Sequence, residues 1–108
     1  MSKDTNDFLT LSSKEALILD LLVSNGRELF GLEMVAASGG RLKRGTVYVM
    51  LQRLQEKGFI DSKLEPRQAP EIGIPRRLYW ITGLGERALA AYQASLSIWQ
   101  SALGTSGV

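Results

Sequence analysis

The strongest constraint on the fold comes from residues 41–58, which predict one short helix with two different faces. Apolar side chains recur there at spacings of three and four residues, and this pattern indicates one buried stripe. The stripe consists of Val47, Met50, Leu51 and Leu54. The opposite side carries Thr46, Val49, Gln52, Arg53 and Glu56. We expect the helix to begin at Gly45 or Thr46 and to end at Gly58, because glycine often terminates helices.

The entrance of this helix is basic, with Arg41, Lys43 and Arg44 directly before its expected start. A short, mostly polar helix with a cationic N-terminal end has dimensions and charge that suit the DNA major groove. Ordinary solvated amphipathic helices share the same pattern. The choice between these two interpretations therefore depends on the rest of the chain.

The composition of the 108-residue chain excludes several classes of function. A chain of this length forms one domain with a thin core, and dimerisation would bury more of its apolar surface. It contains no cysteine and no histidine, so it lacks thiol chemistry and the commonest metal ligand and general base. We therefore predict no catalytic residues, no metal site and no cofactor. The polar N-terminus and the lack of a long apolar run predict a cytoplasmic protein with no membrane partner.

Charge is distributed unevenly along the chain, although the net charge is only +2. Residues 41–77 hold nine cations and four acids, whereas the remainder holds four cations and seven acids. A basic middle between acidic ends indicates a polyanionic partner for the middle. Chance clustering in a small protein is the alternative explanation.

Two further helices are expected before the basic one, preceded by a flexible N-terminal arm over residues 1–11. Ser12 and Glu15 have the spacing of a capping box, which predicts a helix over residues 13–24 that is apolar nearly all round and therefore central. A second helix is expected over residues 30–37. Its inward side chains should be Leu32, Val35 and Ala36. Three short helices in this order are typical of a helix-turn-helix.

A β-hairpin is expected after the basic helix. Residues 59–64 and 76–81 alternate in polarity or are rich in aromatic and branched side chains, which predicts two strands. The segment between them contains all three prolines of the chain and predicts a loop. The predicted fold is mainly α with a small β-hairpin, a winged helix-turn-helix domain over residues 12–82. Its wing would carry Arg67, Arg76 and Arg77.

The last predicted helix spans residues 83–103 and has a narrow apolar seam. Members of the seam follow each other at spacings of three and four residues, as in a coiled-coil heptad. They are Leu89, Tyr92, Leu96, Trp99 and Leu103. A second copy of the chain is the simplest partner for this seam, which predicts a C-terminal dimerisation helix; packing against the chain's own core is the alternative. Residues 104–108 are expected to form a frayed tail.

Two motifs resemble the winged-helix transcriptional regulators of the PadR-like family, and the resemblance covers roughly residues 15–92. The first motif contains Ser38-Gly39-Gly40, Gly45-Thr46-Val47-Tyr48, Leu51-Gln52-Arg53-Leu54 and Glu56-Lys57-Gly58-Phe59-Ile60. The second is Pro75-Arg76-Arg77-Leu78-Tyr79-Trp80-Ile81-Thr82, followed by Gly85. The chain departs from the family pattern at Val49, where proline is common, and at Leu78 and Ile81. The single C-terminal helix resembles the small subfamily, whose dimers are built by that helix.

The resemblance implies sequence-specific binding of an operator in double-stranded DNA by a homodimer. Such a regulator usually represses transcription and in some members responds to a small aromatic or hydrophobic ligand. The residue chemistry suggests roles within that function. Phosphate contacts near the helix N-terminus are expected from Lys43, Arg44, Thr46 and Tyr48, with packing as the alternative for Tyr48.

Base edges would be contacted by Gln52 and Arg53, which can each make bidentate hydrogen bonds. Arg67, Arg76 and Arg77 would follow the adjacent backbone or minor groove. For these residues a solvated surface is the alternative. Trp99 would be either dimer core or a surface that stacks a planar ligand. A winged-helix protein-interaction module, without sequence-specific DNA binding, is the alternative function.

Overall fold

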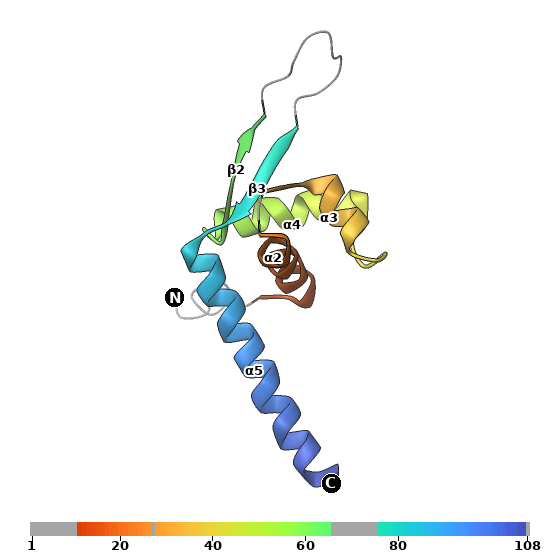
Figure 1. Cartoon of the computed structure of the whole chain (residues 1–108), viewed down its shortest axis with the longest axis vertical. Helices are drawn as coiled ribbons and strands as arrows, with labels where there is room; N and C mark the ends of the chain where they lie inside the picture. The colour runs from red at the N-terminus through yellow and green to blue at the C-terminus, as the bar shows by residue number, and fades with distance from the viewer. Residues whose placement is uncertain (1–10, 27, 66–75, 108) are drawn as a thin grey trace.

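The computed structural model describes residues 11–26, 28–65 and 76–107, and the side chains among them up to residue 101. Within these residues the chain is mainly helical, with one small antiparallel sheet (Figure 1). The elements are α2 (Ser13–Asn25), β1 (Leu29–Phe30), α3 (Gly31–Ala37), α4 (Arg44–Glu56), β2 (Ile60–Leu64), β3 (Arg77–Ile81) and α5 (Gly83–Gly107). This order confirms the predicted fold class of a winged helix-turn-helix followed by a C-terminal helix.

The predicted N-terminal arm is wrong at its inner end. Residues 1–10 lie outside the described part of the chain, but Leu11 is buried in the core. The capping box is confirmed, because the Ser12 hydroxyl accepts from the Glu15 amide at 3.1 Å and the Ser12 amide donates to Glu15 Oε1 at 2.8 Å. Leu11 precedes this cap, a position that often packs against the first turn of the helix, where Ala16 is also buried.

Three strands form the sheet, in the spatial order β1-β3-β2 and with both neighbouring pairs antiparallel. β2 and β3 form the predicted hairpin, in which Ile60 lies opposite Ile81. In the other pair, Leu29 of β1 lies opposite Tyr79 of β3. The sequence patterns did not predict β1, because two residues are too few to show an alternation. This short strand joins the start of α3 to the wing.

The core lies between α2, α4 and the sheet. On α4, the side chains of Val47, Leu51 and Leu54 are fully buried and Met50 nearly so, which confirms the predicted stripe. The central position predicted for α2 is also confirmed, since its apolar residues supply much of the remaining core. A helix buried on several sides needs apolar residues nearly all round, as the sequence of α2 has.

α3 presents a different face to the core from the one predicted. Met34 is fully buried, whereas Leu32 is 45% exposed and Ala36 is exposed. Only Val35 of the predicted inward set packs against the core. The helix follows β1 directly, so the pairing of β1 with β3 sets its rotation. Seven residues are too few for the apolar spacing alone to define a face.

A largely buried ion pair joins the start of α2 to the end of α4. Lys57 Nζ lies 3.2 Å from Glu15 Oε2, and the side chains are 14% and 3% exposed. Glu15 also accepts the Ser12 amide hydrogen bond, so its carboxylate has several partners. Such additional hydrogen bonds are what a buried pair needs to offset the cost of leaving water. The pair therefore fixes the C-terminal end of α4 against α2.

α5 starts on the domain and projects away from it (Figure 1). The Thr82 hydroxyl accepts from the Gly85 amide at 3.0 Å and donates to the Gly58 carbonyl at 2.7 Å, so it caps α5 and joins it to the end of α4. Gly85 approaches Phe59 so closely that a Cβ would overlap the Phe59 carbonyl oxygen. The predicted end of the helix is wrong: α5 continues through residues 104–107 instead of fraying, since a weak helix former such as glycine does not by itself end a helix.

Candidate nucleic-acid interface

The outward face of α4 is the first part of the candidate interface. Thr46, Val49, Gln52, Arg53 and Glu56 are all exposed, as the two-faced pattern predicts. The start of the helix differs slightly from the prediction, because Arg44 is already helical and Lys43 occupies the capping position. The Lys43 side chain makes no capping hydrogen bond. Both cations are exposed beside the first turn.

The turn before α4 is held by the hydroxyl of Ser38. This hydroxyl donates to the Val35 carbonyl at 2.8 Å and accepts from the Leu42 amide at 2.9 Å. Leu42 is buried, and Arg41 Nε donates to the Ser38 carbonyl at 3.3 Å. These bonds keep Arg41 close to the turn, while the two cations that follow it extend into solvent. The turn therefore fixes the direction in which α4 leaves α3.

Two arginines of the wing, Arg76 and Arg77, lie among the described residues, and their surroundings differ. Arg77 Nη1 donates to the Ser62 hydroxyl at 3.0 Å, and that hydroxyl donates to Gln55 Oε1 at 2.9 Å. A hydrogen-bonded chain thus runs from β3 through β2 to α4. Arg76 instead lies over the ring of Phe30, with its guanidinium carbon 4.3 Å from the ring centroid, a cation–π contact. Both arginines remain exposed, and the third predicted wing residue, Arg67, lies outside the described residues.

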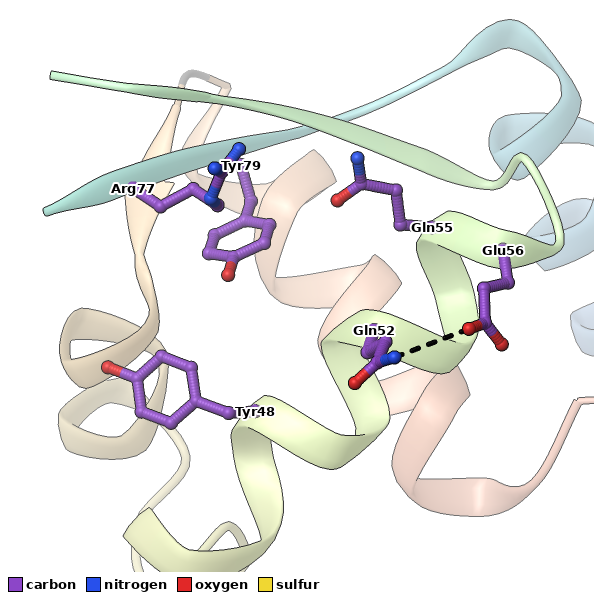
Figure 2. A pocket seen from close by; sticks show the side chains of 6 residues that line it. All are labelled: Tyr48, Gln52, Gln55, Glu56, Arg77 and Tyr79. Atoms are coloured by element: carbon purple, nitrogen blue, oxygen red, sulfur yellow. Dashed lines mark hydrogen bonds between the residues drawn. The ribbon is translucent and has the colours of Figure 1, made fainter.

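A cavity of about 560 Å³ separates α4 from the wing (Figure 2). It is lined by Tyr48, Gln52, Gln55, Glu56, Arg77 and Tyr79. Gln52 Nε2 donates to Glu56 Oε2 at 3.3 Å, so the predicted base-reading amide already has an exposed partner. Figure 2 shows the Tyr79 hydroxyl directed into the space between the strands and α4. The cavity brings predicted residues of the helix and the wing together.

Tyr79 is a residue of this site that the sequence patterns did not identify. Burial raises the pKa of its phenol above the usual value of 10.0, Arg77 acts in the opposite direction, and Tyr48 raises it further. The hydroxyl is therefore protonated at neutral pH and can donate a hydrogen bond. In the sequence Tyr79 is one aromatic residue of a strand, and only the register of β3 places it beside α4. Ser62 was missed for the same reason. Gln55 lies on α4 itself and joins the site through the hydrogen bond that it accepts from Ser62.

Tyr48 packs against the start of α3, the role that the sequence left as the alternative to a phosphate contact, and it also stays exposed. Its ring lies against Gly31, where an added Cβ would come within 2.7 Å of Tyr48 Cε1. Its side chain is nevertheless exposed and lines the cavity. Tyr48 thus packs α4 against the start of α3 while presenting polar surface beside the wing. Glycine at position 31 is what allows this close approach.

The seam predicted for dimerisation divides into two parts. Leu89 is buried in the chain's own core at 5% exposure, so its assignment to a dimer seam is corrected. Tyr92 packs against that core but is only partly buried, and its assignment stays a prediction. Leu96 is 41% exposed and Trp99 is 64% exposed, and both line a shallow apolar cavity with Ile98. The side chain of Leu103 lies outside the described set. Figure 1 shows this distal part of α5 and the wing at opposite ends of the molecule.

The described residues show neither a metal cluster nor a membrane-spanning helix. They contain no group of three or more His, Cys, Asp or Glu residues placed to hold a metal ion. Among the same residues, no helix has the length and hydropathy needed to cross a membrane.

This architecture is similar to that of known proteins. A search of curated proteins finds no match. A PadR-family transcriptional regulator from Eggerthella lenta DSM 2243 superposes with a TM-score of 0.71 at 23% identity, over 86% of this chain and 80% of that chain. A PadR-family transcription regulator from Clostridium difficile R20291 gives a TM-score of 0.71 at 24% identity, over 84% and 94%.

Bacillus subtilis PadR, solved in complex with operator DNA, gives a TM-score of 0.66 at 21% identity, over 78% of this chain and 48% of that chain. These likenesses establish the winged-helix fold. The sequence itself matches the family described as "Transcriptional regulator PadR-like family" over residues 18–91, which is well over half of the chain. That family consists of regulators of transcription and not of enzymes. The chain therefore belongs to the PadR-like family of transcriptional regulators.

Proposed function

We propose that this regulator is a homodimer that binds a (pseudo)palindromic operator through α4 and the wing and represses transcription in the cytoplasm. The observation that carries the proposal is the exposed face of α4, which is polar and begins with Lys43 and Arg44. On the wing, Arg77 lines the cavity shared with α4, and Arg76 is exposed beside it, over the ring of Phe30. A helix of this size with cations at its start suits a major groove, and the wing suits the flanking backbone.

The likeness to Bacillus subtilis PadR bound to operator DNA supports the proposal at the level of the fold. Residue roles follow from chemistry. Lys43, Arg44, Thr46 and Tyr48 would contact phosphates near the start of α4, and Gln52 and Arg53 would contact base edges. Arg67, Arg76 and Arg77 would follow the backbone or the minor groove.

The exposed distal half of α5 supports a homodimer. Leu96 and Trp99 expose apolar surface on the side of the predicted seam, which a second copy would cover, and a two-fold pair would present two α4 helices to DNA. Half-sites about 34 Å apart, one turn of the double helix, would match such a pair. Light scattering should give twice the chain mass. A monomer at micromolar concentration that becomes ordered only with a foreign protein would favour the alternative, a protein-interaction module.

The DNA-binding test is a salt series on the regulator's own upstream region. Affinity should exceed that for random DNA, and the logarithm of the association constant should fall with the logarithm of salt by about 0.9 for each phosphate neutralised. Equal affinity for the upstream region and for random DNA would contradict sequence-specific binding. A reporter gene under the same upstream region should be expressed more strongly when the regulator is deleted, whereas lower expression would indicate an activator.

Two substitutions separate the proposed roles. Arg53→Ala should reduce discrimination between sequences by about 1–3 kcal/mol, because a bidentate base contact is lost. Lys43→Ala should weaken binding to all DNA about equally and reduce the salt slope by about one. Arg87→Ala, which removes an exposed cation from α5, is the matched control and should change neither quantity. Equal losses of discrimination from Arg53→Ala and Lys43→Ala would contradict the division of roles.

Trp99 has two proposed roles, dimer core or a surface for a small aromatic or hydrophobic effector. A Trp80→Phe variant leaves Trp99 as the single tryptophan, since the chain has two. Quenching of its fluorescence by a planar aromatic compound, together with weaker operator binding, would assign the effector role. A fluorescence change that depends on protein concentration alone would assign Trp99 to the dimer core.

A further inference from the structure

Val49 and Gly45 occupy the outermost line of α4. At about 100° per residue, Val49 lies roughly 150° around the helix from the centre of the buried stripe. Gly45 lies one turn before it on the same side. Val49 is 55% exposed, a branched apolar side chain in the middle of a face whose other side chains are mostly polar. The Cα–Cβ bond of a helical residue tilts toward the N-terminus, so Val49 leans over the position of Gly45.

The fold itself does not explain either residue. Valine and glycine both have lower helix propensity than alanine, so neither was needed to form α4. Gly45 has a helical backbone and is not among the glycines with positive φ. A Cβ at Gly45 would meet no atom within 4 Å in the described part of the chain. The two positions therefore form an exposed apolar spot, and no neighbour among the described residues requires glycine at position 45.

We propose that this spot receives the 5-methyl group of thymine in the major groove, so that Val49 and Gly45 help to determine the operator sequence. The inference rests on the proposed DNA-binding function and extends it to two residues with no hydrogen-bonding side chain. The thymine methyl is the apolar group that the major groove displays, and aliphatic side chains contact it. Gln52 and Arg53 lie one turn further along α4, where they would contact neighbouring base pairs. Glycine at position 45 leaves room for the methyl beside Val49.

The chemistry predicts which base changes matter. Replacing thymine by deoxyuridine removes the methyl group and leaves every hydrogen-bonding atom of the base pair in place. Burial of one methyl-sized group corresponds to about a fourfold change in affinity. The effect should therefore appear at one or two thymines in each half-site, while deoxyuridine elsewhere should be neutral.

The experiment uses the full-length chain and an operator obtained by selecting bound sequences. Each thymine is replaced in turn by deoxyuridine, and affinity is measured at fixed salt for the wild type and for Val49→Ala. Replacement of the contacted thymine by deoxyuridine should lower the affinity of the wild type about fourfold. Val49→Ala should bind the thymine operator and the deoxyuridine operator with equal affinity. Val23→Ala, which truncates an exposed valine on α2, is the matched control and should keep the full methyl dependence.

A second variant makes the test independent of folding defects. Gly45→Ala should raise the unfolding temperature, because alanine favours the helix. It should also weaken binding to the thymine operator more than to its deoxyuridine counterpart, because the new methyl would occupy the space of the thymine methyl. A more stable protein with weaker, methyl-sensitive binding cannot be explained by a structural role for Gly45.

The outcomes separate the inference from the proposed function. Sequence-specific binding whose affinity is unchanged by deoxyuridine at every thymine would overturn the inference and leave the proposed function intact. The same holds if Val49→Ala keeps the full methyl dependence. Absence of sequence-specific binding by the wild type would overturn the proposed function, and the inference with it.

Discussion

The two halves of α5 share one apolar period but lie in different surroundings. Leu89 in the first half is 5% exposed and belongs to the core, whereas Trp99 in the second half is 64% exposed. The first half is capped by Thr82 and packs against α2, and the second half projects beyond the domain. A spacing of three and four residues thus identifies the apolar side of a helix, but it does not show which part of that side the chain's own core covers.

Helix length explains the division. α2 has 13 residues and α5 has 25, which correspond to about 20 Å and 38 Å at 1.5 Å per residue. α2 is therefore too short to cover the whole apolar side of α5. The chain's own core covers the first turns of the seam. The exposed remainder is the part that the proposed dimer would cover.

Leu89→Ala and Leu96→Ala make the sharpest comparison, because they delete the same atoms from the two halves. Leu89→Ala should lower the free energy of unfolding by about 3 kcal/mol at every protein concentration, because it leaves a cavity in the core. Leu96→Ala should cost the monomer much less and should act mainly on dimerisation. Urea unfolding at two protein concentrations measures both effects. A loss from Leu96→Ala that is as large as that from Leu89→Ala, and independent of concentration, would remove the distinction between the halves.

Trp99→Ala should produce the next largest effect, and only on assembly. Loss of a large aromatic anchor from an interface typically costs about 2 kcal/mol or more, which raises the dimer dissociation constant roughly 30-fold. The unfolding free energy of the monomer should not change, since the side chain is largely exposed in the single chain. Sedimentation equilibrium gives the dissociation constant. Trp80→Ala on β3 provides the contrast, because it should disturb the fold more than the dimer.

Local patterns predicted the elements that bury one face, because the information lies within a few neighbouring residues. The apolar spacing of α4 located its buried stripe, and the spacing of Ser12 and Glu15 located the start of α2. The cluster of cations before α4 and the glycine at position 58 after it identified α4 as the candidate recognition helix. Local patterns also predicted a hairpin and a last helix after α4, and the observed element order confirms both. The family match confirms the resemblance to the PadR-like family.

Features that depend on tertiary pairing could not be predicted in this way. The bonds from Arg77 to Ser62 and from Ser62 to Gln55 join residues that are 15 and seven positions apart, and only the hairpin register brings them together. Tyr79 becomes part of the candidate site through the same register. The rotation of α3 follows from β1, which is too short to recognise from its sequence.

Thr82→Ala tests how firmly the first half of α5 is attached. The Thr82 hydroxyl accepts from the Gly85 amide and donates to the Gly58 carbonyl, so its loss should cost about 1 kcal/mol of unfolding free energy. Hydrogen exchange should increase at the first turn of α5, while the dimer dissociation constant should change little. Thr46→Ala, on the exposed face of α4, is the matched control for the fold and should have a smaller effect. Equal effects from the two substitutions would show that the cap does not hold α5.

Substitutions at Ser97 should give the smallest effects and test whether the distal half of α5 depends on its own helix propensity. Ser97 is exposed, so Ser97→Ala should favour the local helix by about 0.5 kcal/mol and Ser97→Gly should disfavour it by a similar amount. Because that half projects beyond α2, hydrogen exchange at its amides should follow these changes in dilute solution, where the monomer dominates. At high protein concentration a dimer would add its own protection and reduce the difference. The dimer dissociation constant should shift about twofold in the same direction, because ordering this half is part of the cost of assembly. If neither substitution changes the hydrogen-exchange rates at any protein concentration, contacts within one chain hold the distal half. The contrast between the two halves of α5 would then fail.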